Sequence, residues 1–350
     1  MAVGLRDVAE RAGVSVRTVS NVANDYAHVA PATRRRVQQA IDELGYRPNM
    51  AARQLRQGRT ETISLVVPEI DSPYFAELAS LTVRIAEERG WTVHIDQTDG
   101  DAHRERRMTA GPVGRSVDGV ICSPWAVGPD ELSRLAAGPV GLLGERAAAG
   151  GLDHVAIDNV AASRTATRHL VALGRRRIAA VGAQPHLHND TARLRLEGYR
   201  TALAEAGLPV LDELVEPVTR LHRPDGAAAM ARLLDAPAGP GGVDAVFCFT
   251  DELALGAVRT LADQGLRVPE DVAVVGFDDI EDGRYAVPSL STVSPDKEEI
   301  ARLALQCLAD RIADPSAPAR DLVASHRLVA RGSTARPRGA RHRPAEVPMP

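Results

Sequence analysis

The chain has 350 residues, of which 44% are hydrophobic and 25% are charged, and its formal net charge is −4. This length and composition predict a globular protein of two or three domains and exclude an intrinsically disordered chain. A run of about 18 apolar residues, which a membrane-spanning helix needs, does not occur in the sequence. Its N-terminus carries no secretion signal, so we expect a cytoplasmic protein. The three cysteines lie far apart without metal-ligand spacing, so they predict reduced thiols and no metal site. We expect no cofactor.

Charge is distributed unevenly along the chain. Residues 1–58 contain nine arginines against five acidic residues, a net charge of +4 that leaves −8 for the remainder. A basic N-terminal segment suits contact with phosphates, and an acidic body weakens non-specific adsorption to nucleic acid. Lys297 is the only lysine in the sequence. We attribute this arginine bias to genome composition rather than to chemistry.

Residues 5–24, LRDVAERAGVSVRTVSNVAN, predict two short helices joined by a tight turn. Gly13 supplies the positive φ that ends the first helix, and Ser15 is a suitable N-cap for the second. The inner stripes consist of Val8, Ala9 and Ala12 on the first helix and Val19 and Val22 on the second, while Val16, Arg17, Ser20 and Asn21 face outward. The pattern predicts a helix-turn-helix whose second helix enters the major groove of DNA. The alternative is a pair of packed helices without a nucleic-acid partner.

Two further helical segments follow. Residues 31–44 begin with proline, repeat apolar residues at helical spacing and end before Gly45, so they predict a third helix that closes the small core. Residues 48–58 favour a helix of about two turns, shorter than the ~12–15 residues that an isolated helix needs in water. We therefore expect this segment to fold only against a partner, with Leu55 on its outward side. An ordinary interdomain linker is the alternative.

From Thr62 onward, short apolar strands alternate with amphipathic helices. Strands are expected at 63–67, 91–95, 119–122, 140–143, 155–157, 178–181, 245–248, 272–275 and 322–329, and helices at 76–88, 161–173, 192–206, 228–234, 253–264 and 303–312. This alternation predicts parallel sheets covered on both faces. Its restart near residue 161 predicts two α/β halves, with a ligand cleft beyond the carboxyl ends of the strands. Residues 335–350 are rich in Pro, Arg and Gly and are expected to be disordered.

At this point the sequence resembles the LacI/GalR family of bacterial transcriptional regulators over nearly its whole length. The stretches that carry the resemblance are LRDVAERAGVSVRTVSNVAN, YRPNMAARQLRQGRT, DSPYFAEL, VDGVI, ARLRLEGYRTAL, FTDELALGA, VPEDVAVVGFDDIE and LVARGSTA. The resemblance implies an all-α helix-turn-helix DNA-binding domain and an α/β periplasmic-binding-protein-like effector domain. Two doubly wound parallel-sheet subdomains would make up the effector domain.

The implied domain boundaries follow from these stretches. Residues 1–47 would form the DNA-binding domain, 48–58 the hinge helix and 59–334 the effector-binding and dimerisation domain. Within the last, the N-subdomain is expected to contain 61–158 and 289–319, and the C-subdomain 159–288 and 320–332.

The implied function is that of a nucleoid-associated repressor. It would bind palindromic, double-stranded operator DNA as a homodimer and be released by a small effector, a sugar or sugar derivative. One alternative is a repressor that depends on a purine-type corepressor. An alternative from a different class is a solute-binding module without a DNA function.

The resemblance also assigns DNA-binding positions. Val16 and Arg17 fall where the family reads bases, and Leu55 matches the hinge leucine that wedges between base steps. Asn21 stands where many members have arginine, a departure that bears on base preference. The full expected set is Leu5, Ser15, Val16, Arg17, Thr18, Ser20, Asn21, Asn24, Tyr46, Asn49, Ala52, Arg53, Leu55 and Arg56.

In the implied cleft, Arg195 and Asp278 match residues that hold effector hydroxyls. The full expected effector set is Asp71, Ser72, Phe75, Ser123, Arg195, Leu221, Thr250, Asp251 and Asp278. Gly144 and Leu221 depart from the family, standing near positions that often hold a carboxylate and an aromatic ring. With 11 aromatic residues in the chain, the sequence favours a sugar over a stacked purine. The alternative for Arg195 and Asp278 is a purely structural pairing across the hinge between the halves.

Enzyme sites are not indicated by the sequence. Asp278 and Asp279 are adjacent at a strand end, so their side chains are expected to point apart rather than to form an acid/base pair. The glycine-rich stretch 239–242 is not followed by the Lys-Ser/Thr of a phosphate-binding loop. The serines and histidines form no recognisable triad, and we expect no enzymatic activity.

Overall fold

The computed structural model describes residues 3–23, 26, 28–46, 59–110, 117–144, 151–185, 190–235 and 242–335. The chain divides into two compact units, Met1–Thr60 and Glu61–Pro350. Six of the expected DNA-binding residues lie outside the described residues: Asn24, Asn49, Ala52, Arg53, Leu55 and Arg56. The expected hinge helix and residues 336–350 of the expected tail lie outside them as well.

Unit 1 contains the three expected helices, α1 (Leu5–Ala12), α2 (Val16–Ala23) and α3 (Pro31–Leu44). Gly13 follows α1 with a φ of 63°, in the left-handed region that glycine adopts without strain. Ser15 accepts a hydrogen bond from the Thr18 amide on its Oγ at 3.1 Å, as an N-cap does. The small core consists of Val8, Ala9, Ala12, Val19, Val22, Val37, Ala40 and Tyr46. The helix-turn-helix prediction is confirmed.

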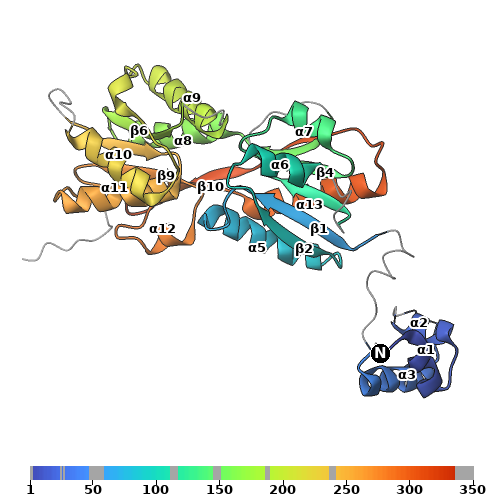
Figure 1. Cartoon of the computed structure of the whole chain (residues 1–350). Helices are drawn as coiled ribbons and strands as arrows, with labels where there is room; N and C mark the ends of the chain where they lie inside the picture. Colours follow the sequence, from blue (N-terminus) through green and yellow to red (C-terminus); the bar gives the residue numbers. More distant parts are fainter. Residues whose placement is uncertain are drawn as a thin grey trace, which may run out of the picture. The chain divides into compact units, whose positions relative to one another are not determined.

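Unit 2 contains two six-stranded sheets with helices on both faces (Figure 1). The first sheet has the strand order β11-β5-β4-β3-β1-β2, and all of its pairs are parallel. The elements of its half are β1 (Thr62–Val67), α5 (Pro73–Glu87), β2 (Thr92–Gln97), α6 (Ala102–Thr109), β3 (Gly119–Cys122), α7 (Pro129–Leu135), β4 (Val140–Leu143), β5 (Asp153–Ile157), α13 (Lys297–Ala313) and β11 (Asp321–Ala324).

The second sheet has the order β12-β10-β9-β8-β6-β7, parallel except for the antiparallel β10–β12 pair. The elements of its half are α8 (Asn159–Ala172), β6 (Ile178–Ala183), α9 (Asp190–Glu205), a 3₁₀ turn (Asp212–Leu214), β7 (Val215–Pro217), α10 (Arg223–Asp235), β8 (Ala245–Cys248), α11 (Asp251–Asp263), β9 (Ala273–Phe277), α12 (Glu281–Tyr285), β10 (Ser291–Pro295) and β12 (His326–Val329).

The structure corrects the expected path of the late chain. Residues 291–295 were expected in the first half, but they form β10 beside β9 in the second sheet. Residues 322–329 were expected to form one strand, but β11 pairs with β5 in the first sheet and β12 with β10 in the second. The red end of the chain therefore runs through both halves (Figure 1). Apolar patterning cannot reveal such a crossing, because both sheets bury the same residue types.

The sequence pattern also did not predict α6, α7, β7, β10 and α12. Helix α6 is rich in arginine and lacks an apolar stripe, yet Asp101 caps it by accepting the Arg104 amide at 2.8 Å. None of the described helices is long and apolar enough to cross a membrane. Cys122, Cys248 and Cys307 are buried free thiols.

Candidate functional site

In unit 1, helix α2 presents its outer face to solvent. Val19 and Val22 are buried in the core, whereas Val16 is 41% exposed at the start of the helix. Arg17 beside it is exposed, and Thr18, Ser20 and Asn21 are partly exposed. An exposed valine and arginine on the first turn of a short helix suit contact with base edges. Leu5 packs against the core and Tyr46 is part of it, so these two expected residues offer a partner little side-chain surface.

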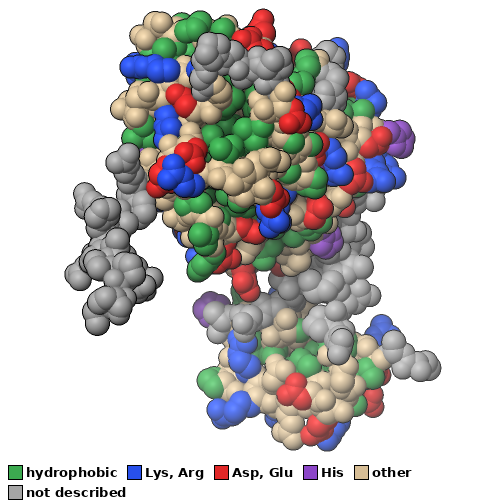
Figure 2. Space-filling view, turned by 90° about the vertical axis from the view of Figure 1, so that its left-hand side faces the viewer, with side chains coloured by type: hydrophobic (Ala, Val, Ile, Leu, Met, Phe, Trp, Pro, Cys, Tyr) green, Lys and Arg blue, Asp and Glu red, His purple; other side chains and the backbone are tan. Residues whose placement is uncertain are grey.

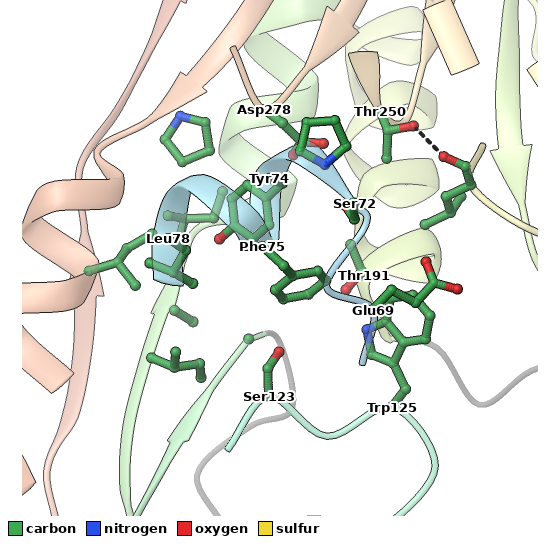
Figure 3. A pocket seen from close by; sticks show the side chains of 18 of the residues that line it. Glu69, Ser72, Tyr74, Phe75, Leu78, Ser123, Trp125, Thr191, Thr250 and Asp278 are labelled. Atoms are coloured by element: carbon green, nitrogen blue, oxygen red, sulfur yellow. Dashed lines mark hydrogen bonds between the residues drawn. The ribbon is translucent and has the colours of Figure 1, made fainter. Parts of the chain in front are cut away.

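Unit 2 contains a cavity between its two halves, at the carboxyl ends of strands from both sheets. Seven of the nine expected effector residues line it: Ser72, Phe75, Ser123, Arg195, Leu221, Thr250 and Asp278. Figure 3 shows several of these side chains around the open space, from both halves of unit 2. Asp71 is exposed and Asp251 is fully buried, and neither lines the cavity. Topology thus brings together residues that lie up to two hundred positions apart.

Arg195, on α9, is fixed at the cavity wall. Its Nε donates to Asn159 Oδ1 at 2.8 Å, and its Nη1 donates to the carbonyl of Phe249. The guanidinium lies 3.5 Å from the centroid of the Phe277 ring. These partners all belong to the second half of unit 2. They therefore do not form the structural pairing across the hinge that was the alternative for Arg195. They leave Nη2 directed toward Asp278, whose Oδ1 lies 3.8 Å away.

Asp278 and Asp279 follow β9 with φ angles of 110° and 51°, in the left-handed region. The Asp278 side chain lines the cavity, whereas Asp279 Oδ1 accepts from Arg331 at 2.5 Å and Oδ2 accepts from Ser294 Oγ at 3.0 Å. Burial raises the pKa of Asp279, but the hydrogen bond and charge of Arg331 outweigh it and hold that pKa below its usual value. The two carboxylates therefore serve different partners, as predicted.

Asp251 supports the cavity from behind. Its Oδ2 accepts the Ile280 amide at 2.9 Å and so holds the loop after β9. Burial raises the pKa of Asp251 well above its usual value, and the nearby Asp278 charge adds to that shift. The neighbouring Thr250 hydroxyl donates to the Leu221 carbonyl at 3.1 Å, the contact dashed in Figure 3. Asp251 therefore holds the loop after β9 and does not line the cavity.

One wall of the cavity is aromatic: Phe75 was expected to line the cavity, but Tyr74 and Trp125 were not. The rings of Tyr74 and Phe75 meet edge to face with centroids 5.1 Å apart, and Phe75 meets Trp125 at 6.2 Å. All three line the cavity from the first half of unit 2. The composition argument against stacking is therefore wrong, because these few aromatic residues gather at the site. Trp125 follows β3 by three residues, and that position at a strand end was the available signal.

An ion-pair cluster joins the two halves beside the cavity. Glu69 follows β1 and pairs with Arg220 at 2.9 Å and with His222 Nε2 at 3.0 Å. His222 Nδ1 also lies 3.6 Å from Glu252, and partial burial raises the pKa of that carboxyl. Among the described lining residues, the carboxylates are Glu69, Asp190, Glu252 and Asp278, against the single guanidinium of Arg195. On the surface that faces the viewer in Figure 2, by contrast, acidic and basic side chains are interspersed.

Comparisons with known proteins agree with this arrangement. Residues 4–49 match the profile of bacterial regulatory proteins of the lacI family, and residues 167–334 match a periplasmic binding protein-like domain. The ribose operon repressor of Escherichia coli K12 is 34% identical over 332 residues, 94% of this chain and 99% of the repressor. The chain belongs to the lacI family. The PurR repressor of Proteus mirabilis is also 34% identical, over 95% of this chain and 96% of its own.

Solved lacI-family structures share the fold of this chain. A lac repressor dimer bound to operator and the anti-inducer ONPF superimposes with a TM-score of 0.82 at 26% identity, covering 95% of this chain and 99% of that one. The relatives named here are transcriptional repressors rather than enzymes. No cluster of three or more potential metal ligands occurs within the described ranges of this lacI-family chain.

Proposed function

We propose that this chain is a sequence-specific transcriptional repressor that acts in the cytoplasm on a palindromic operator. The observation that carries the proposal is the exposed first turn of α2. Ser15 caps this helix and its inner face is buried, so Val16 and Arg17 face outward. Full-length similarity to named repressors supports it. The segment 48–58 serves as the DNA-ordered hinge, and 59–334 as the effector-binding and dimerisation domain.

A binding-site selection with the full chain tests the DNA function. A palindrome with one half-site for each protomer is the expected result, because a two-fold symmetric dimer imposes two-fold symmetry on its site. Selection of no inverted repeat, or binding that does not depend on sequence, would refute the proposal. The solute-binding alternative predicts that no site is selected at all.

The effector we propose is an uncharged sugar. One side of the cavity is aromatic, and the other carries hydroxyl, carboxylate and guanidinium groups. A pyranose matches this division, because it has an apolar face and polar hydroxyl groups. Each sugar hydroxyl both donates and accepts, so it can use Asp278 and Arg195 together. A phosphate or carboxylate on the ligand would meet the Asp278 carboxylate and a guanidinium that is already hydrogen-bonded. The nearby Arg193 and Arg220 are already paired with the lining carboxylates Asp190 and Glu69. One relative of this chain is a ribose operon repressor, which supports the proposal of a sugar effector.

A purine corepressor is the second candidate. The aromatic wall of Tyr74, Phe75 and Trp125 could stack a planar base, and a PurR repressor is among the relatives. The two candidates predict opposite responses in one titration. A sugar releases the operator, whereas a purine corepressor strengthens operator binding.

The deciding experiment measures operator affinity against a panel of neutral sugars, their phosphates, hypoxanthine and guanine. We expect release by a neutral sugar, no response to its phosphate, and loss of the response in Arg195→Ala. Tightening by hypoxanthine or guanine without any sugar response would replace the sugar by a purine. A normal sugar response in Arg195→Ala would overturn the assignment of the cavity as the effector site.

A further inference from the structure

Lys297, the only lysine of the chain, is almost completely buried. It is the first residue of α13, directly after β10 and Asp296, where the chain passes from the second sheet to the first half of unit 2. The residue is 5% exposed, although lysine is among the side chains least often buried. A buried ammonium is costly unless it is paired and hydrogen-bonded, so its partners indicate what it stabilises.

The Lys297 ammonium has partners in both halves of unit 2. Its Nζ donates to the carbonyl of Asp278 at 2.8 Å and to that of Asp279 at 3.3 Å, both just after β9 in the second half. It also donates to Glu77 Oε2, on α5 in the first half. The Tyr74 ring on the same helix lies 5.9 Å from Nζ. One side chain at the crossing therefore joins α5 to the turn that follows β9.

Both joined segments form walls of the cavity. The Asp278–Asp279 turn has positive φ at two non-glycine residues, a conformation that surrounding contacts must maintain. The Lys297 ammonium is held to both of its carbonyls, while the Asp278 carboxylate faces Arg195. On the other side, Tyr74, Phe75 and Leu78 of α5 line the cavity within one helical turn of Glu77.

We propose that Lys297 is a positioning residue for the effector site, and that the Glu77–Lys297 pair couples the two halves of unit 2. The pair transmits a change at the Asp278 turn to α5, so breaking it weakens the effector response without removing any side chain that lines the cavity. This inference rests on the proposed effector-controlled repressor. A lysine that only stabilised the fold would affect unfolding but not this response.

The first test uses the single lysine as its own probe. The full chain is treated with an amine-acetylating reagent, and modification of Lys297 is followed by mass spectrometry, with the urea-unfolded chain as the reference rate. We expect strong protection in the wild type and acetylation about tenfold faster in Glu77→Gln, because loss of the carboxylate charge favours local opening. Glu87→Gln, the same change at an exposed position of α5, is the matched control and should retain the wild-type rate.

This readout needs neither operator nor effector, so it separates the inference from the proposed function. Lys297 acetylated in the wild type as fast as in urea would overturn the bridge. An unchanged rate in Glu77→Gln would overturn it as well. Failure to find an operator, with Lys297 protection intact and dependent on Glu77, would instead remove the proposed function and with it the regulatory part of the inference.

The second test measures coupling. The ratio of operator affinities without and with the releasing sugar should fall by about fivefold or more in Glu77→Gln and stay unchanged in Glu87→Gln. Lys297→Arg, which keeps the charge, should retain more of the ratio than Lys297→Met. A melting temperature within a few degrees of wild type shows that Glu77→Gln folds. Normal coupling in a folded Glu77→Gln chain with rapid Lys297 acetylation would show a purely structural bridge and overturn the proposal.

Discussion

Arg195 and Asp278 face each other at the cavity wall, with Nη2 and Oδ1 separated by 3.8 Å and both side chains nearly buried. The distance is too long for a direct hydrogen bond, so a ligand hydroxyl in the cavity can bridge donor and acceptor from one side. Arg195 is held by Asn159 and Phe249, and Asp278 by the turn that Lys297 binds. The two groups are therefore placed before any ligand arrives, which reduces the entropy cost of binding.

Asp278→Asn should weaken binding of the releasing sugar by about tenfold or more, since a hydrogen bond to a charged group contributes about 1.5–3 kcal/mol. It should also reduce the discrimination against the matching sugar phosphate, because one of the four lining carboxylates is gone. Calorimetric titration with both ligands measures the two effects. Wild-type affinity for the sugar in this variant would contradict the role of Asp278.

Glu105→Gln should disturb the aromatic wall from a distance. The Glu105 carboxylate is fully buried on α6 and accepts the amides of Trp125, Ala126 and Val127 at 2.7–3.1 Å. An amide group cannot accept all of these donors, so we expect unit 2 to lose about 1–3 kcal/mol of unfolding free energy.

The Glu105→Gln substitution should also change the position of Trp125. Tryptophan fluorescence and denaturant unfolding of unit 2 check the Glu105→Gln prediction. Glu131→Gln, at a partly exposed position, serves as the control, because it loses only a surface pair with Arg106. Unaltered stability together with unaltered fluorescence in Glu105→Gln would show that the carboxylate does not hold this loop.

Arg17→Ala should relax specificity at one base pair per half-site while leaving backbone affinity largely intact. A bidentate arginine–guanine contact contributes about 1–3 kcal/mol of discrimination, whereas phosphate contacts depend on salt and not on sequence. Parallel site selections with wild type and variant measure the effect. The prediction fails if both select the same motif with the same information at every position.

Leu55→Ala should leave effector binding unchanged but remove most operator affinity and DNA bending. Leu55 lies outside the described residues, and the expectation rests on its match to a wedge that kinks DNA at the minor groove. Gel-shift and bending assays on the selected operator test it. Full bending by the variant would exclude a wedge at this position.

The proposed homodimer is expected to stop at two copies. Residues 334–350 are rich in Pro and Arg and have no heptad repeat, so we do not expect this stretch to form a coiled coil that joins two dimers. Light scattering should give the mass of two chains over a range of concentrations. A tetramer mass that does not change with concentration would contradict the prediction.

Local chemistry in the sequence was enough to determine the helix-turn-helix, whereas seven of the residues that line the cavity were expected from the family resemblance. The two helices of unit 1 are determined by signals that lie within a few residues: Gly13, Ser15 and the spacing of Val19 and Val22. Caps and apolar stripes act over one or two helical turns. The resemblance placed Ser72, Ser123 and Asp278 in the cleft. Their positions after apolar strands agree with this, because the carboxyl ends of parallel strands meet at one edge of a sheet.

The late crossings, the aromatic wall and the burial of Lys297 between its partners were decided only by the tertiary structure. The sequences of strands β10 (STVSP) and β11 (DLVA) carry no local signal that assigns either strand to one sheet. Their sheet partners β9 and β5 are chosen by long-range packing. Asp251 and Asp278 are both acidic residues after apolar segments, yet one is buried behind a loop and the other faces the cavity. A lysine 220 positions from its carboxylate partner gives no periodic signal, because burial and pairing exist only once both halves have folded.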